Sequence, residues 1–97
     1  MRLFYRTSLP GAAVLSTAES FFTGLGCSTV ATALRGRTFT GPLGTARLMV
    51  RAEGGHYTFV EVHTDQIGES RLDKNVKKFF VALHRRTEPA HALEAGY

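Results

Sequence analysis

The chain has a single cysteine, Cys27, and no apolar run that approaches the length of a membrane-spanning segment. One cysteine excludes a disulfide within the chain, so an oxidising compartment is not required. A helix that crosses a bilayer needs about 20 consecutive apolar residues, so no membrane partner is expected. Residues 1–18 contain Arg2 and Arg6 and no acidic residue, so they superficially resemble a targeting peptide. Pro10 and Gly11, however, interrupt the apolar stretch that such a peptide needs. We therefore expect a cytoplasmic protein.

Groupings typical of catalytic and metal sites are missing from the sequence as well. The four histidines lack the paired spacing of a metal site, and Cys27 has no second cysteine beside it. Acidic residues are scattered singly. Gly24-Leu25-Gly26 follows a helical pattern, whereas a dinucleotide-binding loop follows a strand, so these glycines indicate a helix end. The sequence predicts no cofactor, no metal and no catalytic residue, and an enzyme that pairs Cys27 with a distant histidine is an alternative without a motif.

Positive charge is in excess. The 97 residues include 12 lysines and arginines against 8 acidic residues, which gives a formal net charge of +4. This balance favours a polyanionic partner such as RNA or the ribosome. Small soluble proteins that bind no polyanion are often mildly basic as well. Hydrophobic residues make up 43% of the chain, which is enough for one modest core, so we expect a single domain.

The segment Arg71–Arg86 has the clearest pattern in the chain. Five apolar residues recur at helical spacing and fall on one side of a helix: Leu72, Val76, Phe79, Phe80 and Leu83. Between Lys74 and Arg86 there are five cationic residues and no acidic one. We predict a helix whose other side contacts phosphates through Arg71, Lys74, Lys77, Lys78, Arg85 and Arg86. The alternative is an ordinary solvated face, on which lysine stems cover apolar surface.

The first third of the chain predicts a strand and a shorter helix. Residues 1–7 have the composition of a strand. The helix begins near Pro10, or near Thr17 if residues 16–19 form a capping box, and it ends at Gly24 and Gly26. Its apolar side is expected to consist of Val14, Leu15, Ala18, Phe21, Phe22 and Leu25. At the other end of the chain, residues 87–97 are expected to be a flexible tail outside a domain of residues 1–86.

Between residues 28 and 64 the apolar period changes from 3.6 to 2, which indicates strands. We expect one strand over residues 29–39, a turn at residues 41–44, and two further strands. Side-chain alternation fixes the loop between the last two strands. A three-residue loop of Gly54, Gly55 and His56 gives one clean apolar face, with Val50 opposite Val60 and Leu48 opposite Val62. A two-residue loop would mix charged and apolar side chains on that face, so we predict the odd length.

The same register predicts the composition of the other sheet face. It places Arg51 opposite Phe59 and Arg47 opposite His63. Rings can stack on bases while guanidinium groups meet phosphates, which is what single-stranded nucleic-acid binding needs. We therefore predict a second RNA-binding patch formed by Arg47, Arg51, Tyr57 and Phe59. Two alternatives stay open: one helix packs on each face of the sheet, or Met49, Tyr57 and Phe59 form a homodimer interface.

These elements predict an α+β single domain of order βαβββα, with an antiparallel sheet and two helices packed on one face. This order resembles the ribosome hibernation-promoting factor family, whose members bind the small ribosomal subunit. The best match is in the last helix, where Leu72-Asp73, Val76, Lys78, Phe79 and Leu83 are similar to the family's pattern of Ile-Asp, aliphatic, Lys, Leu and Leu. Gly54-Gly55 also lies about where many members turn. The resemblance implies a ribosome-associated protein without catalytic activity.

The first helix departs from that family, because it carries Glu19 and no lysine where the family's helix is longer and lysine-bearing. The αβββα portion also resembles a double-stranded-RNA-binding domain, but Arg71-Leu72-Asp73 stands where that domain has a lysine-rich start to its final helix. The sequence thus predicts a non-enzymatic module that binds RNA or the ribosome through its basic helix and its basic, aromatic sheet face. The alternative from another class is an oligomeric protein-interaction or small-ligand module that uses the exposed sheet face.

Overall fold

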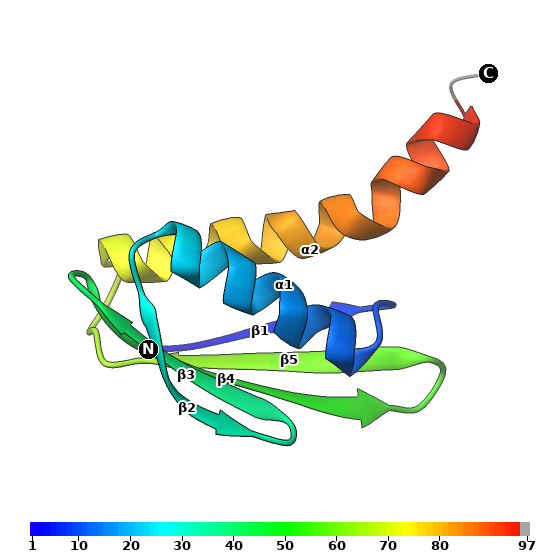
Figure 1. Cartoon of the computed structure of the whole chain (residues 1–97). Coiled ribbons are helices and arrows are strands. Elements are labelled where there is room, and N and C mark those ends of the chain that lie inside the picture. The colour runs from blue at the N-terminus through cyan, green and yellow to red at the C-terminus, as the bar shows by residue number, and fades with distance from the viewer. Residues whose placement is uncertain (96–97) are drawn as a thin grey trace.

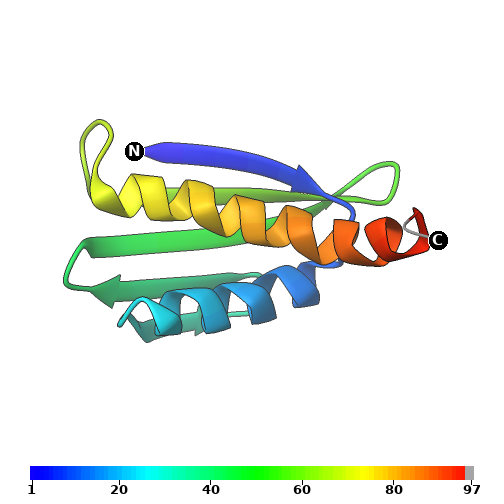
Figure 2. The same ribbon diagram turned by 90° about the horizontal axis from the view of Figure 1, so that it is seen from above.

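Five antiparallel strands form one sheet, and both helices lie on the same face of it (Figure 1). The computed structural model describes the backbone of residues 1–95 and the side chains of residues 1–87. The elements are β1 (Arg2–Thr7), α1 (Gly11–Gly24), β2 (Ser28–Ala33), β3 (Gly36–Gly41), β4 (Gly44–Glu53), β5 (Tyr57–Thr64) and α2 (Arg71–Ala95). Across the sheet the strands lie in the order β1-β5-β4-β3-β2. Figure 2 shows α1 over the β2 and β3 side and α2 beside it, nearer β1 and β5. The predicted α+β single domain with both helices on one face is confirmed.

The sheet has one strand more than the sequence predicts, so the order is βαββββα. Residues 29–39 do not form one strand, because the chain turns back at Leu34-Arg35 and pairs Ala33 with Gly36. Neither central position of this turn is a glycine, proline or asparagine, so the usual sequence signal is missing. The Val50 N–H donates to the Arg35 carbonyl at 2.9 Å. Because the chain turns back at Leu34-Arg35, residues 28–33 form a separate strand, β2, at the edge of the sheet, and all six of its residues are exposed.

The loop between β4 and β5 has the predicted odd length. It consists of Gly54, Gly55 and His56, and the last two have φ angles of 79° and 68°. Glycine adopts such angles freely, whereas histidine does so less often. The register that the loop sets is the predicted one: Val50–Val60 and Leu48–Val62 on the helix side, Arg51–Phe59 and Arg47–His63 on the other.

Helix α1 begins at the earlier of the two predicted positions. Pro10 is its N-cap, and the Pro10 carbonyl accepts hydrogen bonds from the N–H groups of Ala13 and Val14 at 3.0 and 3.1 Å. Residues 16–19 therefore lie inside the helix and do not start it. The Thr17 hydroxyl instead donates to the Ala13 carbonyl at 2.8 Å, which is a bond made within a helix.

The core between the helices and the sheet is built around phenylalanines. Phe22 of α1 stacks on Phe39 of β3 with ring centroids 4.7 Å apart, and Phe79 of α2 lies 5.5 Å from Phe22. The predicted apolar side of α2 is confirmed throughout, and that of α1 in large part. The buried apolar residues of the two helices, over residues 1–87, are Val14, Leu15, Ala18, Phe22, Leu72, Val76, Phe79, Phe80 and Leu83. Phe21 is only partly buried, and Leu25 is exposed because it follows the last helical turn.

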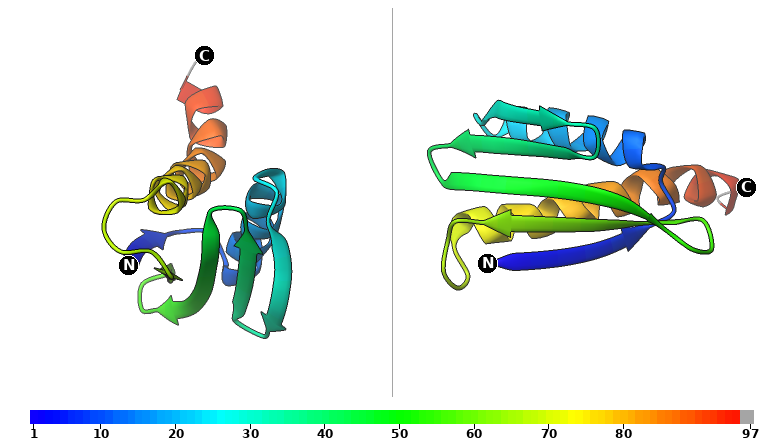
Figure 3. Two further views of the ribbon diagram at one scale, coloured as in Figure 1. Left: turned by 90° about the vertical axis from the view of Figure 1, so that its left-hand side faces the viewer. Right: turned by 90° about the horizontal axis from the view of Figure 1, so that it is seen from below.

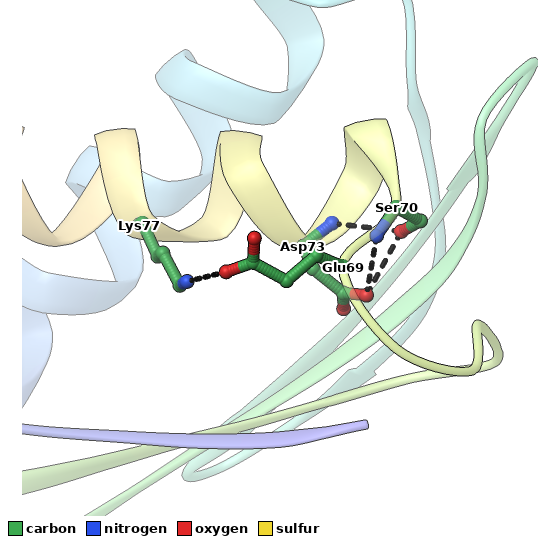
Figure 4. Close-up of polar contacts among 4 residues, drawn as sticks. All are labelled: Glu69, Ser70, Asp73 and Lys77. Carbon is green, nitrogen blue, oxygen red and sulfur yellow. Dashed lines mark hydrogen bonds and ion pairs between the residues drawn. The ribbon is translucent and has the colours of Figure 1, made fainter.

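Asp73 anchors the start of α2 (Figure 4). Its carboxylate accepts hydrogen bonds from the N–H and the hydroxyl of Ser70 at 3.1 and 2.9 Å. The Asp73 N–H donates in return to the Ser70 hydroxyl oxygen at 3.1 Å, which completes a reciprocal cap. Thr64, at the end of β5, donates its hydroxyl to the other carboxylate oxygen at 2.6 Å. The cap therefore also joins the helix to the sheet.

Helix α2 continues past Arg86, where the sequence predicts its end, and runs to Ala95. The Arg86 guanidinium donates to the Ala13 carbonyl at 3.1 Å and to the Thr17 hydroxyl, and so ties α2 to α1. That residues 87–97 are a flexible tail stays a prediction. Residues 96–97, the last two of this segment, lie outside the described residues.

Candidate nucleic-acid interface

In the part of the chain that the structure describes, no helix lies on the sheet face opposite α1 and α2 (Figure 3). We call this surface the open face. Three of the rows of residues that cross this face are Arg6, Phe59 and Arg51; Phe4, Glu61, Met49, Gly36 and Ala33; and Arg2, His63, Arg47, Thr38 and Ala31. The alternative with one helix on each face is therefore wrong.

Phe59 lies at the centre of the first row and contacts two cations. The guanidinium carbons of Arg51 and Arg6 lie 4.4 and 5.6 Å from the centroid of its ring. Glu53, at the end of β4, pairs with both arginines, at 2.7 Å from Arg6 Nε and 3.9 Å from Arg51 Nη2. A guanidinium that lies over a ring still has donors at its edge, so it can stack and bind an anion at the same time.

A second cluster surrounds Glu61. Its Oε2 atom lies 3.2 Å from Arg2 Nε and 2.7 Å from His63 Nε2. Arg2 also covers the ring of Phe4, with its guanidinium carbon 4.4 Å from the ring centroid. The centroids of Phe4 and Phe59 are 5.4 Å apart, so these two rings form one aromatic platform between the two clusters.

Exposed side chains occupy other positions of the open face as well. Tyr57, opposite Glu53, is 52% exposed, and Met49 of the second row is 40% exposed. Arg47 is also exposed, and among the described residues it has no acidic partner. The structure therefore brings together all four residues of the predicted sheet patch: Arg47, Arg51, Tyr57 and Phe59. Four arginines against Glu53 and Glu61 leave the open face positively charged.

The open face is hollowed by a groove of about 420 Å³ between β2 and β4. We call it the β2–β4 groove. Small residues line one side of it, namely Ala31, Ala33 and Gly36, and larger ones line the other, namely Arg47, Met49 and Arg51. The groove exists because β2 and β3 present almost no side-chain volume on this face.

The predicted basic residues of α2 lie on the other side of the molecule. All six are exposed. Among the described residues, four of them make no side-chain hydrogen bond or ion pair: Arg71, Lys74, Lys78 and Arg85. Lys77 forms an ion pair with Glu69, which precedes the helix (Figure 4). The hydrogen bond and the charge of Lys77 hold the pKa of Glu69 below its ordinary value. Arg86 is bonded to α1. The ten predicted residues thus lie on two surfaces, the basic side of α2 and the open face, with the core between them.

Sequence reasoning missed Arg2, Phe4 and Arg6, which β1 contributes to the open face. A signal was present, because these residues alternate with Leu3, Tyr5 and Thr7 at the period of a strand. Spacing alone does not say which strand β1 joins. In the structure β1 pairs with β5, which places Arg2 opposite His63 and Arg6 opposite Phe59. This pairing completes the aromatic platform.

Cys27 and the possible metal ligands are the remaining reactive groups of the chain. Burial raises the pKa of the Cys27 thiol, which lowers the fraction of reactive thiolate. Within the described residues, no group of three or more histidines, cysteines and acids is placed to hold a metal ion. Neither helix, over its described residues, is long and apolar enough to cross a membrane.

Comparison with known proteins leaves the function to be inferred from the residues themselves. No protein-family model matches this chain, and a search of curated proteins finds no match. The chemistry of the open face and of α2 is therefore the basis for a functional assignment.

Proposed function

We propose that the protein is a non-enzymatic module that binds single-stranded RNA, including exposed RNA of the ribosome, through its open face. The observation that carries this proposal is the platform of Phe4 and Phe59, flanked by Arg2, Arg6 and Arg51. Every base has a flat face that can stack on such rings or on the guanidinium planes that cover them, and the outer donors of the guanidinium groups hold the phosphates between the bases.

A sheet surface of this kind suits a single strand better than a duplex. The deep, narrow major groove of an RNA duplex does not admit side chains from a sheet, and paired bases are already stacked inside it. Phe4 and Tyr57 are 46% and 52% exposed, and they can receive bases that are not paired. The resemblance to ribosome hibernation-promoting factors supports the ribosome as the source of that RNA and remains part of the proposal.

The basic side of α2 offers a second place for phosphates. Arg71, Lys74, Lys78 and Arg85 are exposed there, on the far side of the core from the aromatic platform. A short single strand on the open face does not reach them. A large folded RNA, such as the ribosome, can meet both surfaces, so α2 would add affinity only for such a partner.

Binding of single-stranded RNA is expected to weaken steeply as salt rises, because arginines that neutralise phosphates release counterions. Replacing Arg47 by alanine should weaken binding and lower the magnitude of the slope of log affinity against log salt by about one. Arg85→Ala on α2 is the matched control, and its slope should equal that of the wild type. Affinity can be measured by fluorescence anisotropy with a short labelled oligonucleotide over a salt series.

Two results would contradict this proposal. One is the absence of binding at low salt, which would remove the RNA-binding function. The other is a loss of affinity on Arg85→Ala with none on Arg47→Ala, which would move the binding site from the open face to α2.

A second candidate, from a different class, is self-association through β2. Six uncharged residues form this edge strand, and Val30 and the following Leu34 are 56% and 88% exposed. Edge strands usually carry charges or proline that prevent pairing with another chain. β1, at the other edge, has Arg2 and Arg6, whereas β2 has only a β-bulge between Thr29 and Ala31. Two β2 strands in antiparallel pairing would oppose no like charges across a twofold axis.

Light scattering after size exclusion tests this candidate. If copies pair through β2, the wild type should have the mass of a dimer and Val30→Lys that of a monomer. Val81→Lys, at a similarly exposed apolar residue of α2, should leave the dimer intact. Loss of the dimer on Phe59→Ala alone would instead favour the homodimer predicted at Met49, Tyr57 and Phe59, and a monomeric wild type would exclude both.

A further inference from the structure

The β2–β4 groove combines a small-residue floor with positive charge. Ala31 and Ala33 of β2 lie across from Thr38 and Gly36 of β3, so this part of the open face has almost no side-chain bulk. The neighbouring positions on β4 carry large side chains, with Met49 opposite Gly36. The groove therefore has a shallow floor of small residues, which we call the shelf. Its β4 side, which we call the wall, is apolar at Met49 and cationic on either side of Met49.

Two arginines mark the ends of this wall. Arg47 and Arg51 lie two residues before and after Met49 on β4, and both line the groove. Among the described residues that line it, Glu61 is the one carboxylate, and that carboxylate is already paired with Arg2 and His63. The charge facing a molecule in the groove is thus mainly positive, which favours an anionic occupant.

Gly36, the first residue of β3, keeps the floor of the groove low and lets the backbone of β4 come close. Glycine inside a strand weakens the sheet and often marks a place where a ligand or another backbone comes close. A Cβ atom at Gly36 would lie 3.2 Å from the Leu48 carbonyl oxygen and 3.8 Å from Met49 Cγ. It would also stand on the floor of the groove, between Ala33 and Met49, and so raise that floor.

We propose that the β2–β4 groove holds one nucleotide of the bound RNA, an inference that rests on the proposed function of the open face. The base lies flat on the shelf of Ala33 and Gly36 with one edge against Met49, and its phosphate is held by Arg47 or Arg51. A volume of about 420 Å³ is in the range of pockets that hold small organic ligands.

This placement gives the RNA a direction across the sheet. Phe59 lines the groove at its β5 side and contacts Phe4 of β1. A strand that begins in the groove therefore passes next over Phe59 and then over Phe4, perpendicular to the β-strands. Arg51 lies between the first two positions, because it lines the groove and also covers the Phe59 ring.

The test fills the groove without touching the aromatic platform. Ala33 is exposed, so Ala33→Leu should fold, and its larger side chain would occupy the shelf. Ala12→Leu, at an exposed residue of α1, is the matched control. Loss of the contacts of one nucleotide should lower the affinity for a short single-stranded oligoadenylate by about 5-fold or more in Ala33→Leu, since a factor of that size is the lower end of what a base stacked on a ring contributes. The control should bind like the wild type.

Adenosine monophosphate serves as a second probe, followed by NMR. In the wild type it should shift the backbone amide signals of Ala33, Gly36 and Met49, and in Ala33→Leu these shifts should disappear. If the wild type binds the oligoadenylate and Ala33→Leu binds it equally well, the groove assignment is overturned while the proposed function stands. If the wild type does not bind the oligoadenylate but the nucleotide still shifts the groove signals, the proposed function fails and the groove remains a nucleotide site.

Discussion

Phe22→Ala is expected to lower the free energy of unfolding by about 3–5 kcal/mol, the range for a buried phenylalanine truncated to alanine. Phe22 is fully buried and links three elements, since its ring contacts Phe39 of β3 at 4.7 Å and Phe79 of α2 at 5.5 Å between centroids. The cavity left by its removal would lie where both helices meet the sheet. Urea unfolding measures the effect as a lower midpoint with a similar dependence on urea concentration.

Such a loss is large for this protein, because domains of this size are stable by only about 5–15 kcal/mol. Phe4→Ala provides the matched control, since Phe4 is 46% exposed on the open face. Its removal should lower the free energy of unfolding by about 1 kcal/mol or less, because little surface is buried there. Equal effects of the two substitutions would show that the core is not centred on Phe22.

Asp73→Ala is expected to lower the free energy of unfolding by about 3 kcal/mol. Asp73 is fully buried, and its carboxylate accepts bonds from Thr64 and from two donors of Ser70. Alanine leaves these donors without a partner, at a cost of about 1–3 kcal/mol for each one that stays buried. It also removes half of the reciprocal cap of α2. Glu69→Gln, which breaks an exposed pair with Lys77, is the control and should change stability little, because solvent screens such a pair.

The effect of Asp73→Ala should depend on pH. Burial raises the pKa of the Asp73 carboxyl, but hydrogen bonds from Thr64 and Ser70 outweigh burial and hold the pKa below its ordinary value. The stabilisation is therefore fully present above the unfolded-state pKa of about 4, and it is lost as pH falls through the lower pKa of the folded protein.

Unfolding of both proteins between neutral pH and strong acid measures this dependence. The difference in stability between the wild type and Asp73→Ala should be constant near neutral pH and shrink in acid. Asp65 and Glu69 also have lowered pKa values. The contribution of Asp65 cancels in the difference, and that of Glu69 cancels in large part, because the Asp73 charge is the smallest of the causes that shift the Glu69 pKa. A difference that grows in acid would contradict the assignment of a charged Asp73.

Leu72 and Asp73, at the start of the last helix, have a structural role. The resemblance to hibernation-promoting factors that the sequence suggests rests partly on the Leu72-Asp73 pair, and both residues are buried here. Their role in this protein is to pack α2 on the sheet and to cap its start. Similarity at these positions therefore concerns the fold, and the RNA-binding proposal depends on Arg47 and the aromatic platform instead.

The charge on the open face has a consequence for binding. Arg2, Arg6 and Arg51 are paired with Glu61 or Glu53 in the absence of a ligand. A phosphate must compete with these carboxylates, which lowers the gain from each contact. Arg47 has no such partner among the described residues, so it should contribute more per residue than the paired arginines.

Much of the fold could be predicted from the sequence because the patterns involved are local. The helical period fixed the buried side of α2, and the parity of the three-residue loop fixed the pairing of β4 with β5. The turn at Leu34-Arg35 was missed because it lacks turn residues, so one predicted strand became two. Local pattern also explains why part of the candidate site was predicted. Arg47, Arg51, Tyr57 and Phe59 lie on β4 and β5, two adjacent strands joined by the three-residue loop.

By itself, then, the sequence determined which side of each helix and strand is apolar, since side-chain direction follows from residue spacing within an element. Only the tertiary structure decided that β1 lies beside β5, which brings Arg2, Phe4 and Arg6 next to Phe59. It also decided between the predicted arrangement, with both helices on one face, and the alternative with one helix on each face, so the other face is open and the basic side of α2 lies away from it. These facts depend on contacts between residues far apart in the chain, and the spacing of residues along one segment carries no information about them.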